Sequence, residues 1–181
     1  MIIHQFTQGN VVGSYELTGL SPFAERLLTN AHRRTRALEH LIVHCTATDP
    51  VTTRYTPADL ERDHRARGWL GIGYHFYITQ GATVYQTRGI EDIGAHCQGY
   101  NLSSLGIAYE GGWDSVAAQP YDSLTAAQEG SMRELLTALH KRFPHAQIVG
   151  HRDMPGVHKA CPCFDVAKRF ADLSTFAPTA N

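Results

Sequence analysis

The stretch "GHRDMPGVHKACPCFD", residues 150–165, carries four side chains that commonly bind metal ions. These are His151, His158, Cys161 and Cys163. Cysteine and histidine clustered at short spacing are typical of a zinc site. In a closed site all four residues would bind one ion, and the role of the ion would be structural. In an open site only some of them bind, and one position remains for the water molecule that a catalytic zinc activates.

The spacing alone leaves both arrangements open and favours the open one only modestly. An open site would take two ligands from this stretch and a third from His44, which ends the apolar run Leu41-Ile42-Val43. A ligand at the end of a strand is held rigidly, which suits catalysis. The remaining alternative is that none of these residues binds metal, because cysteine is often a small buried hydrophobe.

The elements that must position these side chains alternate between strands and helices. Apolar runs and alternating patterns predict strands within residues 40–47, 104–112 and 146–150, and a hairpin over 74–88 that turns at Gln80-Gly81-Ala82. One helix is predicted to begin at the N-cap Thr56 and to end at Gly68, and another closes the domain over 164–173. These elements predict an α/β fold, a single domain whose central mixed sheet is flanked by helices.

The most clearly predicted helix spans residues 125–143. Thr125 and Gln128 form a capping-box pair at its beginning. Apolar residues then recur at helical spacing, a pattern that indicates a face packed on the core. They are Met132, Leu135, Leu136, Leu139 and Phe143.

The N-terminal segment is the least informative part of the sequence. "SPFAERLLTNAHRR" predicts one short helix there, with Ser21 as N-cap and Pro22 at the first helical position. We expect an N-terminal extension over residues 1–37, a domain over 38–175 and a tail over 176–181.

The composition is that of a globular chain without strong charge. Of its 181 residues 43% are hydrophobic, which is enough for a substantial core. Charged residues make up 18% and the formal net charge is -1, so nothing favours nucleic acid, whose binding depends on clustered lysine and arginine. We therefore expect a small or uncharged ligand, no nucleic acid, and a monomer.

The first ten residues, "MIIHQFTQGN", contain neither a basic start nor a sustained apolar run. The sequence thus predicts no secretory signal and no transmembrane helix. We expect a product that is cytoplasmic as synthesised, inserts into no membrane, and leaves the cell, where it does so, by another route.

Four stretches occur in a fixed order along the chain: "IVHCTAT", "GWLGIGYHFYI", "GAHCQGYNLSSLGIAYEGG" and "GHRDMPGVHKACPCFD". In this order they resemble the zinc-dependent N-acetylmuramoyl-L-alanine amidases, a family that includes phage lysozyme-type amidases and peptidoglycan recognition proteins. The resemblance covers residues 38 to about 170 and leaves the N-terminal segment outside it. It implies the fold of that family and hydrolysis of the amide between N-acetylmuramic acid and L-alanine in peptidoglycan.

The resemblance also implies an open site with one zinc ion per chain. The ligands carried over are His44 of "VHCTAT", His151 of "HRD" and Cys161 of "KAC". His158 and Cys163 would then belong to the loop without binding the metal, His158 facing solvent and Cys163 as a packed thiol.

Catalytic roles are implied for Tyr74, in "GYHF", and for Lys159, two residues before Cys161. Lys159 would stabilise the oxyanion that develops during hydrolysis, and Tyr74 would hydrogen-bond that oxyanion or the attacking water. Without the motifs, the two residues would be interpreted as a strand tyrosine with a satisfied hydroxyl and a solvated cation.

Substrate contacts are expected for His75, His96 and Asn101, because the matching motifs often line the cleft in the family. Two of them have a structural alternative: His75 would point to the face opposite to Tyr74, and Asn101 would cap a turn.

One catalytic position of the family is vacant in this chain. Some relatives use a glutamate as a base where this sequence has Ala108. Glu110 lies two residues further along and faces the same side of an extended strand, so it could take the place of that base. As a candidate catalytic residue it ranks below Tyr74.

A binding module that holds muropeptide without cutting it is the alternative function. Related recognition proteins that are not enzymes typically lose the cysteine ligand, so Cys161 favours hydrolysis. The biological setting stays open, since a phage endolysin, a prophage remnant, an exported effector and a recycling enzyme all fit.

Overall fold

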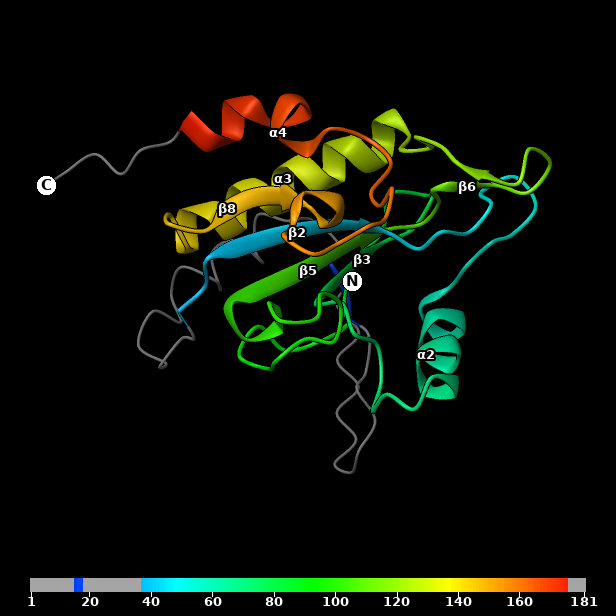
Figure 1. Ribbon diagram of the computed structural model, residues 1–181, viewed down its shortest axis with the longest axis horizontal. Coiled ribbons are helices and arrows are strands. Elements are labelled where there is room, and N and C mark those ends of the chain that lie inside the picture. Colours follow the sequence, from blue (N-terminus) through cyan, green and yellow to red (C-terminus); the bar gives the residue numbers. More distant parts are fainter. Residues whose placement is uncertain (1–14, 18–36, 176–181) are drawn as a thin grey trace, which may run out of the picture.

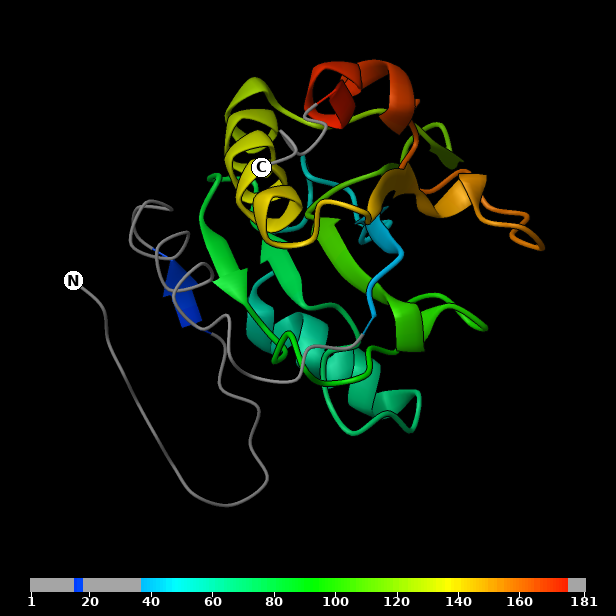
Figure 2. The same cartoon turned by 90° about the vertical axis from the view of Figure 1, so that its left-hand side faces the viewer.

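The computed structural model describes residues 15–17 and 37–175, which build a six-stranded sheet with helices on both faces (Figure 1; Figure 2). The strand order is β1 (Tyr15–Leu17), β4 (Val84–Gln86), β3 (Phe76–Ile78), β5 (Ser104–Tyr109), β2 (His40–Cys45) and β8 (Gln147–Gly150). β2 is parallel to β5 and β8, and β5 is parallel to β3, whereas β4 is antiparallel to both its neighbours. The expected α/β fold on a mixed sheet is therefore confirmed.

Helices α3 (Ala126–Arg142) and α4 (Val166–Arg169) lie on one face of the sheet, and α2 (Pro57–Ala66) lies on the other (Figure 1; Figure 2). The described residues also form three 3-10 turns: η1 (Asn101–Ser103), η2 (His151–Asp153) and η3 (Ala171–Thr175). A separate two-stranded sheet, β6 (Trp113–Asp114) and β7 (Gln119–Pro120), was not expected. The helix expected near Ser21 lies outside the described residues, and the division of the chain at residues 37 and 175 stays a prediction.

The two longer helices begin as their sequences predict. At α3, the side chain of Thr125 accepts from the N–H of Gln128 at 3.2 Å, and the side chain of Gln128 accepts from the N–H of Thr125 at 3.1 Å. At α2, Thr56 and Asp59 form the same reciprocal pair. Each box satisfies two backbone donors that the first turn of a helix leaves without partners.

Strand β2 is buried on both faces, and its alternation decides what each face carries. Leu41, Val43 and Cys45 pack into the large core that α3 and α4 cover. Because successive side chains of a strand point to opposite faces, Ile42 and His44 lie on the face that carries α2. This alternation places a histidine on the less heavily covered side of the sheet.

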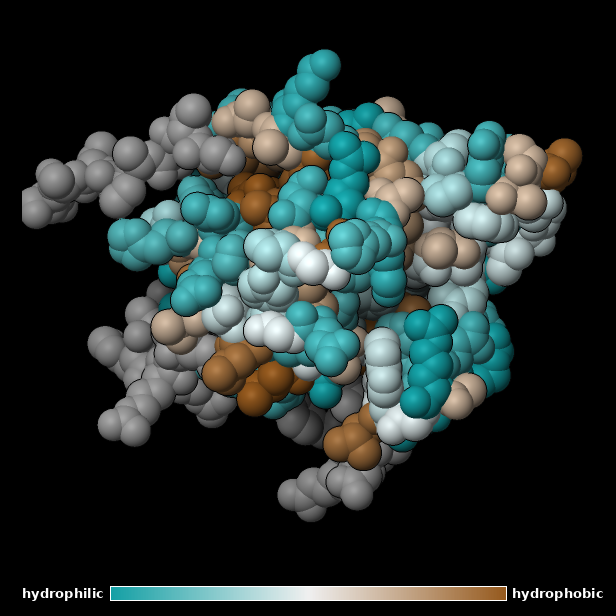
Figure 3. All heavy atoms as spheres, viewed as in Figure 1, coloured by the Kyte–Doolittle hydropathy of each residue, from teal (hydrophilic) through white to brown (hydrophobic). Residues whose placement is uncertain are grey.

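The surface in the view of Figure 3 is mostly hydrophilic, with apolar side chains in small, separate groups. Single exposed apolar residues are ordinary on a soluble surface. Among the described residues, no helix has the length and apolarity that crossing a membrane requires.

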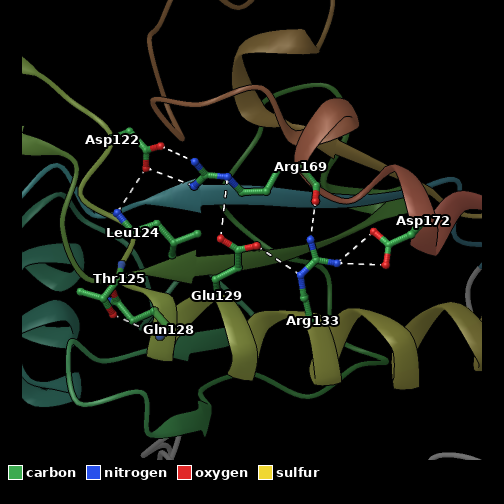
Figure 4. Close-up of polar contacts among 8 residues, drawn as sticks. All are labelled: Asp122, Leu124, Thr125, Gln128, Glu129, Arg133, Arg169 and Asp172. Atoms are coloured by element: carbon green, nitrogen blue, oxygen red, sulfur yellow. Dashed lines mark hydrogen bonds and ion pairs between the residues drawn. The ribbon is translucent and has the colours of Figure 1, made fainter.

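An ion-pair network joins α3 to the end of the domain (Figure 4). Arg133 of α3 contacts Glu129 at 3.2 Å and Asp172 of η3 at 2.9 Å, and it donates to the carbonyl of Arg169 at 2.5 Å. Arg169 in turn contacts Asp122 at 2.5 Å. The network holds α4 against α3, and α4 directly follows the loop that carries Cys161.

The Arg133→Ala variant is expected to lose about 1–2 kcal/mol of unfolding free energy, because several charge-assisted contacts disappear while solvent screens each of them. The guanidinium also lies 5.0 Å from the ring centroid of Phe170, a contact that alanine removes. Urea unfolding followed by circular dichroism measures the change. Arg62→Ala is the control, since Arg62 is 65% exposed and forms only surface pairs, so its midpoint should stay near that of the unmodified chain. Equal midpoints for both variants would contradict a role of the network in stability.

Candidate active site

His44 and His151 meet because β2 and β8 are neighbours in the sheet. Gly150, the last residue of β8, pairs with Val43 of β2. The residues that follow this pair are His44 in β2 and His151 directly after β8, and their ring centroids are 4.4 Å apart. Both side chains are buried, at 1% and 7% exposure.

The turn after β8 is fixed by its own backbone contacts. The N–H of Gly150 donates to Oδ2 of Asp153 at 2.9 Å, which closes the η2 turn that begins with His151. A side chain at Gly150 would begin 2.8 Å from this same carboxylate oxygen, so a larger residue would displace the Asp153 side chain. The motif "GHRD" thus fixes the backbone turn from which His151 projects.

Cys161 comes back to the two histidines at the end of the same loop. The N–H of Arg152 donates to the carbonyl of Cys161 at 2.7 Å and joins the two ends of the loop. Sγ of Cys161 accepts from the N–H of Cys45 at 3.2 Å and lies 3.8 Å from Nδ1 of His44.

The three side chains form a cluster that fits a metal ion. One donor atom from each of His44, His151 and Cys161 lies within 4.8 Å of the others. Two imidazole nitrogens and one sulfur are a donor set that suits zinc. Nε2 of His44 is already occupied, because it lies 3.1 Å from Nδ1 of His96. Nδ1 is therefore the atom that His44 offers to an ion.

Both histidines of the cluster are neutral at neutral pH. Burial, followed by the nearby His96, His151 and Lys159, holds the pKa of His44 well below its usual range. Burial and then Lys159 lower the pKa of His151 to about 4. Neutral imidazole is the form that binds a metal ion, so no proton has to be displaced from these nitrogens at pH 7.

The other two candidates of the loop point elsewhere. Cys163 has its Sγ 3.8 Å from Sγ of Cys45, and it donates to the carbonyl of Gly112 at 3.4 Å. His158 is exposed on the loop. Within the described residues the cluster contains neither of them, so the closed arrangement of four ligands is not formed.

Tyr74 lies beside the cluster, just before β3. Its ring centroid is 5.1 Å from that of His44 and 5.3 Å from that of His64. Burial raises the pKa of Tyr74 far above its usual value. The hydroxyl is therefore protonated at neutral pH and able to donate a hydrogen bond.

Lys159 is exposed and lies on the wall of a cavity of about 730 Å³. His151 and His96 line the same cavity, and Arg67 and Trp69, which follow α2, contribute to it as well. Among the described residues that line it there is no aspartate or glutamate. The cavity thus combines cations, imidazoles and an indole beside the cluster.

Two of the three expected substrate contacts have structural roles. His75 is fully buried, with Nδ1 accepting from the N–H of Gly106 at 3.0 Å and Nε2 lying 3.0 Å from the carbonyl of Asp92. Both ring nitrogens serve the fold, which corrects the expected substrate contact. Asn101 lines the cavity, but its Oδ1 accepts from the N–H groups of His96 and Cys97 at 2.8 and 2.9 Å and so braces that loop.

Glu110 is not available as the missing base. Its carboxylate is buried and accepts from the N–H of Tyr55 at 2.6 Å and from that of Gln80 at 2.7 Å. Ala108, opposite His44 in the register, is fully buried among apolar side chains. Neither Ala108 nor Glu110 therefore provides a free carboxylate for the role that the resemblance gives to a glutamate.

Sequence reasoning missed the contact between His96 and His44 and the place of Arg67 and Trp69 in the cavity wall. His96 lies in an irregular segment without periodicity, so no local pattern could predict its partner. For Trp69 the sequence offered one signal: a tryptophan directly after the helix stop Gly68 lies in a connecting segment, and large aromatic residues are common at binding surfaces. In the structure its side chain is indeed only partly buried.

Comparison with known proteins gives a consistent result. The sequence profile of the N-acetylmuramoyl-L-alanine amidase family matches residues 34–164. The endolysin of Klebsiella phage KP32 is 35% identical over 128 residues, which cover 71% of this chain and 82% of that protein. The endolysin of Escherichia phage T7 is 33% identical over 137 residues, or 75% and 87% of the two chains. Among solved structures, the N-acetylmuramoyl-L-alanine amidase LysC from Clostridium intestinale URNW superposes with a TM-score of 0.64 at 29% identity, covering 76% of this chain and 85% of that one.

Proposed function

This chain belongs to the N-acetylmuramoyl-L-alanine amidase family, and from that premise we infer that it hydrolyses the amide bond between N-acetylmuramic acid and L-alanine in peptidoglycan. One observation carries the inference furthest. His44 comes from β2, and His151 and Cys161 come from a loop more than 100 residues later, yet one donor atom of each lies within 4.8 Å of the others beside the cavity. A module that only binds muropeptide has no need of such a cluster.

We propose that these three residues hold one Zn2+ per chain. The two neutral imidazoles and the cysteine sulfur are zinc ligands by their chemistry, and three protein ligands leave a position open. When bound, zinc supplies Lewis acidity, which polarises the scissile carbonyl and lowers the pKa of water to about 7. His96, behind His44, completes the support of the cluster.

Tyr74 and Lys159 are proposed as the residues that meet the reacting amide. The carbonyl oxygen becomes negatively charged as the carbon turns tetrahedral, and donors placed near that charge lower the barrier. Tyr74 donates a hydrogen bond from its protonated hydroxyl. Lys159 offers a compact positive charge from the cavity wall, two residues from Cys161.

The cavity suits a muropeptide. Peptidoglycan stems carry carboxylates, and Arg67 and Lys159 are cations on a wall where the described residues include no acid. Like charges would repel such a ligand, whereas this lining attracts it. We propose that the peptide stem of the substrate lies along this wall.

Digestion of purified sacculi tests the function. We expect the zinc-loaded protein to release stem peptides with a free L-alanine amino group and to leave a free lactyl carboxyl on N-acetylmuramic acid, both identified by mass spectrometry. The matched control is the same protein after removal of metal by a chelator, which should release nothing until zinc is restored. Binding of muropeptides without any new chain ends, with zinc present, would instead identify a recognition module.

A further inference from the structure

A line of polar groups runs from the ligand cluster into the sheet. Nε2 of His44 lies 3.1 Å from Nδ1 of His96. Nε2 of His96 lies 3.5 Å from Oγ of Ser104, which donates to the carbonyl of Tyr100 at 2.7 Å. The three side chains are 1%, 9% and 0% exposed, and the two contacts between these side chains are buried.

The carbonyl at the end of this line fixes the direction of the serine hydrogen bond and favours one direction for the rest of the line. A carbonyl oxygen only accepts, so the hydroxyl of Ser104 donates its hydrogen to Tyr100 and accepts at its oxygen. A hydrogen bond from His96 to Ser104 then needs the proton of His96 on Nε2, which makes its Nδ1 the acceptor. In that arrangement His44 carries its proton on Nε2, and its Nδ1 keeps a lone pair on the side of Cys161.

The segment around His96 is shaped to hold this ring in place. A methyl group on Gly106 of β5 would lie 2.6 Å from Cγ of His96, and one on Gly94 would lie 2.5 Å from Cδ2. Both glycines are thus required for the ring to lie against the sheet. The backbone N–H of His96 is held by Oδ1 of Asn101. In the stretch "SLG", Ser104 provides the hydroxyl that faces Nε2 of His96, and Gly106 leaves room for the His96 ring.

We propose that His96 is a positioning residue, which holds His44 in the tautomer whose Nδ1 faces the ion and which is itself held by Ser104. The proposal rests on the proposed function only where it speaks of zinc. Partners on the outer nitrogen of a ligating histidine typically contribute 10- to 100-fold to metal affinity or activity, because they fix the ring and its tautomer.

Three variants separate the hydrogen bonds from packing. His96→Phe keeps a ring over Gly106 but removes both nitrogens. His96→Asn keeps an acceptor near the place of Nδ1 and loses the link to Ser104. Ser104→Ala removes only the oxygen at the far end. We expect zinc affinity to fall about 10- to 100-fold in His96→Phe and less in the other two.

The deciding measurement uses the zinc-free protein, labelled with nitrogen-15. Long-range proton–nitrogen spectra should show His44 and His96 each protonated on Nε2 alone in the unmodified chain. In His96→Phe, His44 should become a mixture of tautomers, and in Ser104→Ala the same should hold for His96. Thermal unfolding of each variant reports whether the fold is kept.

Several results would overturn the proposal. A proton on Nδ1 of His44 in the unmodified chain would do so, and so would unchanged tautomers and zinc affinity in His96→Phe. If that variant does not fold, an unchanged His96 tautomer in Ser104→Ala decides against the line. Absence of zinc binding by the unmodified chain would count against the proposed function instead, since the tautomers are read without metal.

Discussion

Cys161→Ala is expected to bind zinc more than about a hundredfold more weakly and to lose hydrolysis, since loss of a mere outer partner already costs 10- to 100-fold. The sulfur is one of only three donors in the cluster, and the two imidazoles that remain cannot fix the position of an ion. Metal content after dialysis, together with release of stem peptides from sacculi, measures both effects.

Cys163→Ser is the matched control for Cys161→Ala. Cys163 lies two residues away on the same loop, but its Sγ faces Cys45 and the carbonyl of Gly112. It should keep both zinc and activity. Loss of metal in Cys163→Ser while His44→Ala keeps it would restore the closed, structural site and remove the basis for hydrolysis.

Lys159→Ala is expected to keep zinc and to lose about a hundredfold in kcat, the typical cost of one missing donor to a developing oxyanion. Lys159 is exposed on the cavity wall, so its removal leaves no buried gap, and the fold should be unaffected. If the charge acts only in the transition state, KM changes little while kcat falls. Steady-state kinetics on a soluble muropeptide, with metal content measured in parallel, tests this.

Lys168→Ala serves as the control for this second variant. Lys168 is an exposed lysine of α4 that does not line the cavity, so the same loss of charge should leave kcat unchanged. Equal turnover in Lys159→Ala and the unmodified protein would exclude Lys159 from the reaction. A loss of zinc in Lys159→Ala would give it a role in metal binding instead.

The regular elements could be predicted because their signals are local. Thr125 and Gln128 lie three residues apart and cap α3 as expected, and the apolar run before His44 forms β2. The order of the strands in the sheet, in contrast, has no local signal in the sequence. Nothing in the sequence pattern says that β8 returns to lie beside β2, and that neighbourhood alone puts His151 next to His44. For this part of the site, the resemblance to a family provided what periodicity could not.

The roles of the motif residues around the ligands were only partly predictable. His75, His96 and Asn101 were all expected to contact substrate, and each makes hydrogen bonds that hold the fold around His44. Only His96 and Asn101 also line the cavity, so for these two the substrate contact stays a prediction. A histidine that binds a ligand and one that braces a strand look alike in a sequence, since the difference lies in which groups face its two nitrogens. Glu110 shows the same limit, because its backbone partners come from two distant loops.

The distance along the chain between the ligands has a consequence for the whole domain. His44 and Cys161 are 117 residues apart, yet their side chains lie 3.8 Å from one another. A shared ion would close a ring that contains most of the domain, and clips across long loops remove the most freedom from the unfolded chain. Occupancy and folding stability are thereby linked: ion binding to the native state alone raises the cost of unfolding. An ion held by His44 and Cys161 would thus stabilise the native domain by joining β2, near its beginning, to the loop before α4, near its end.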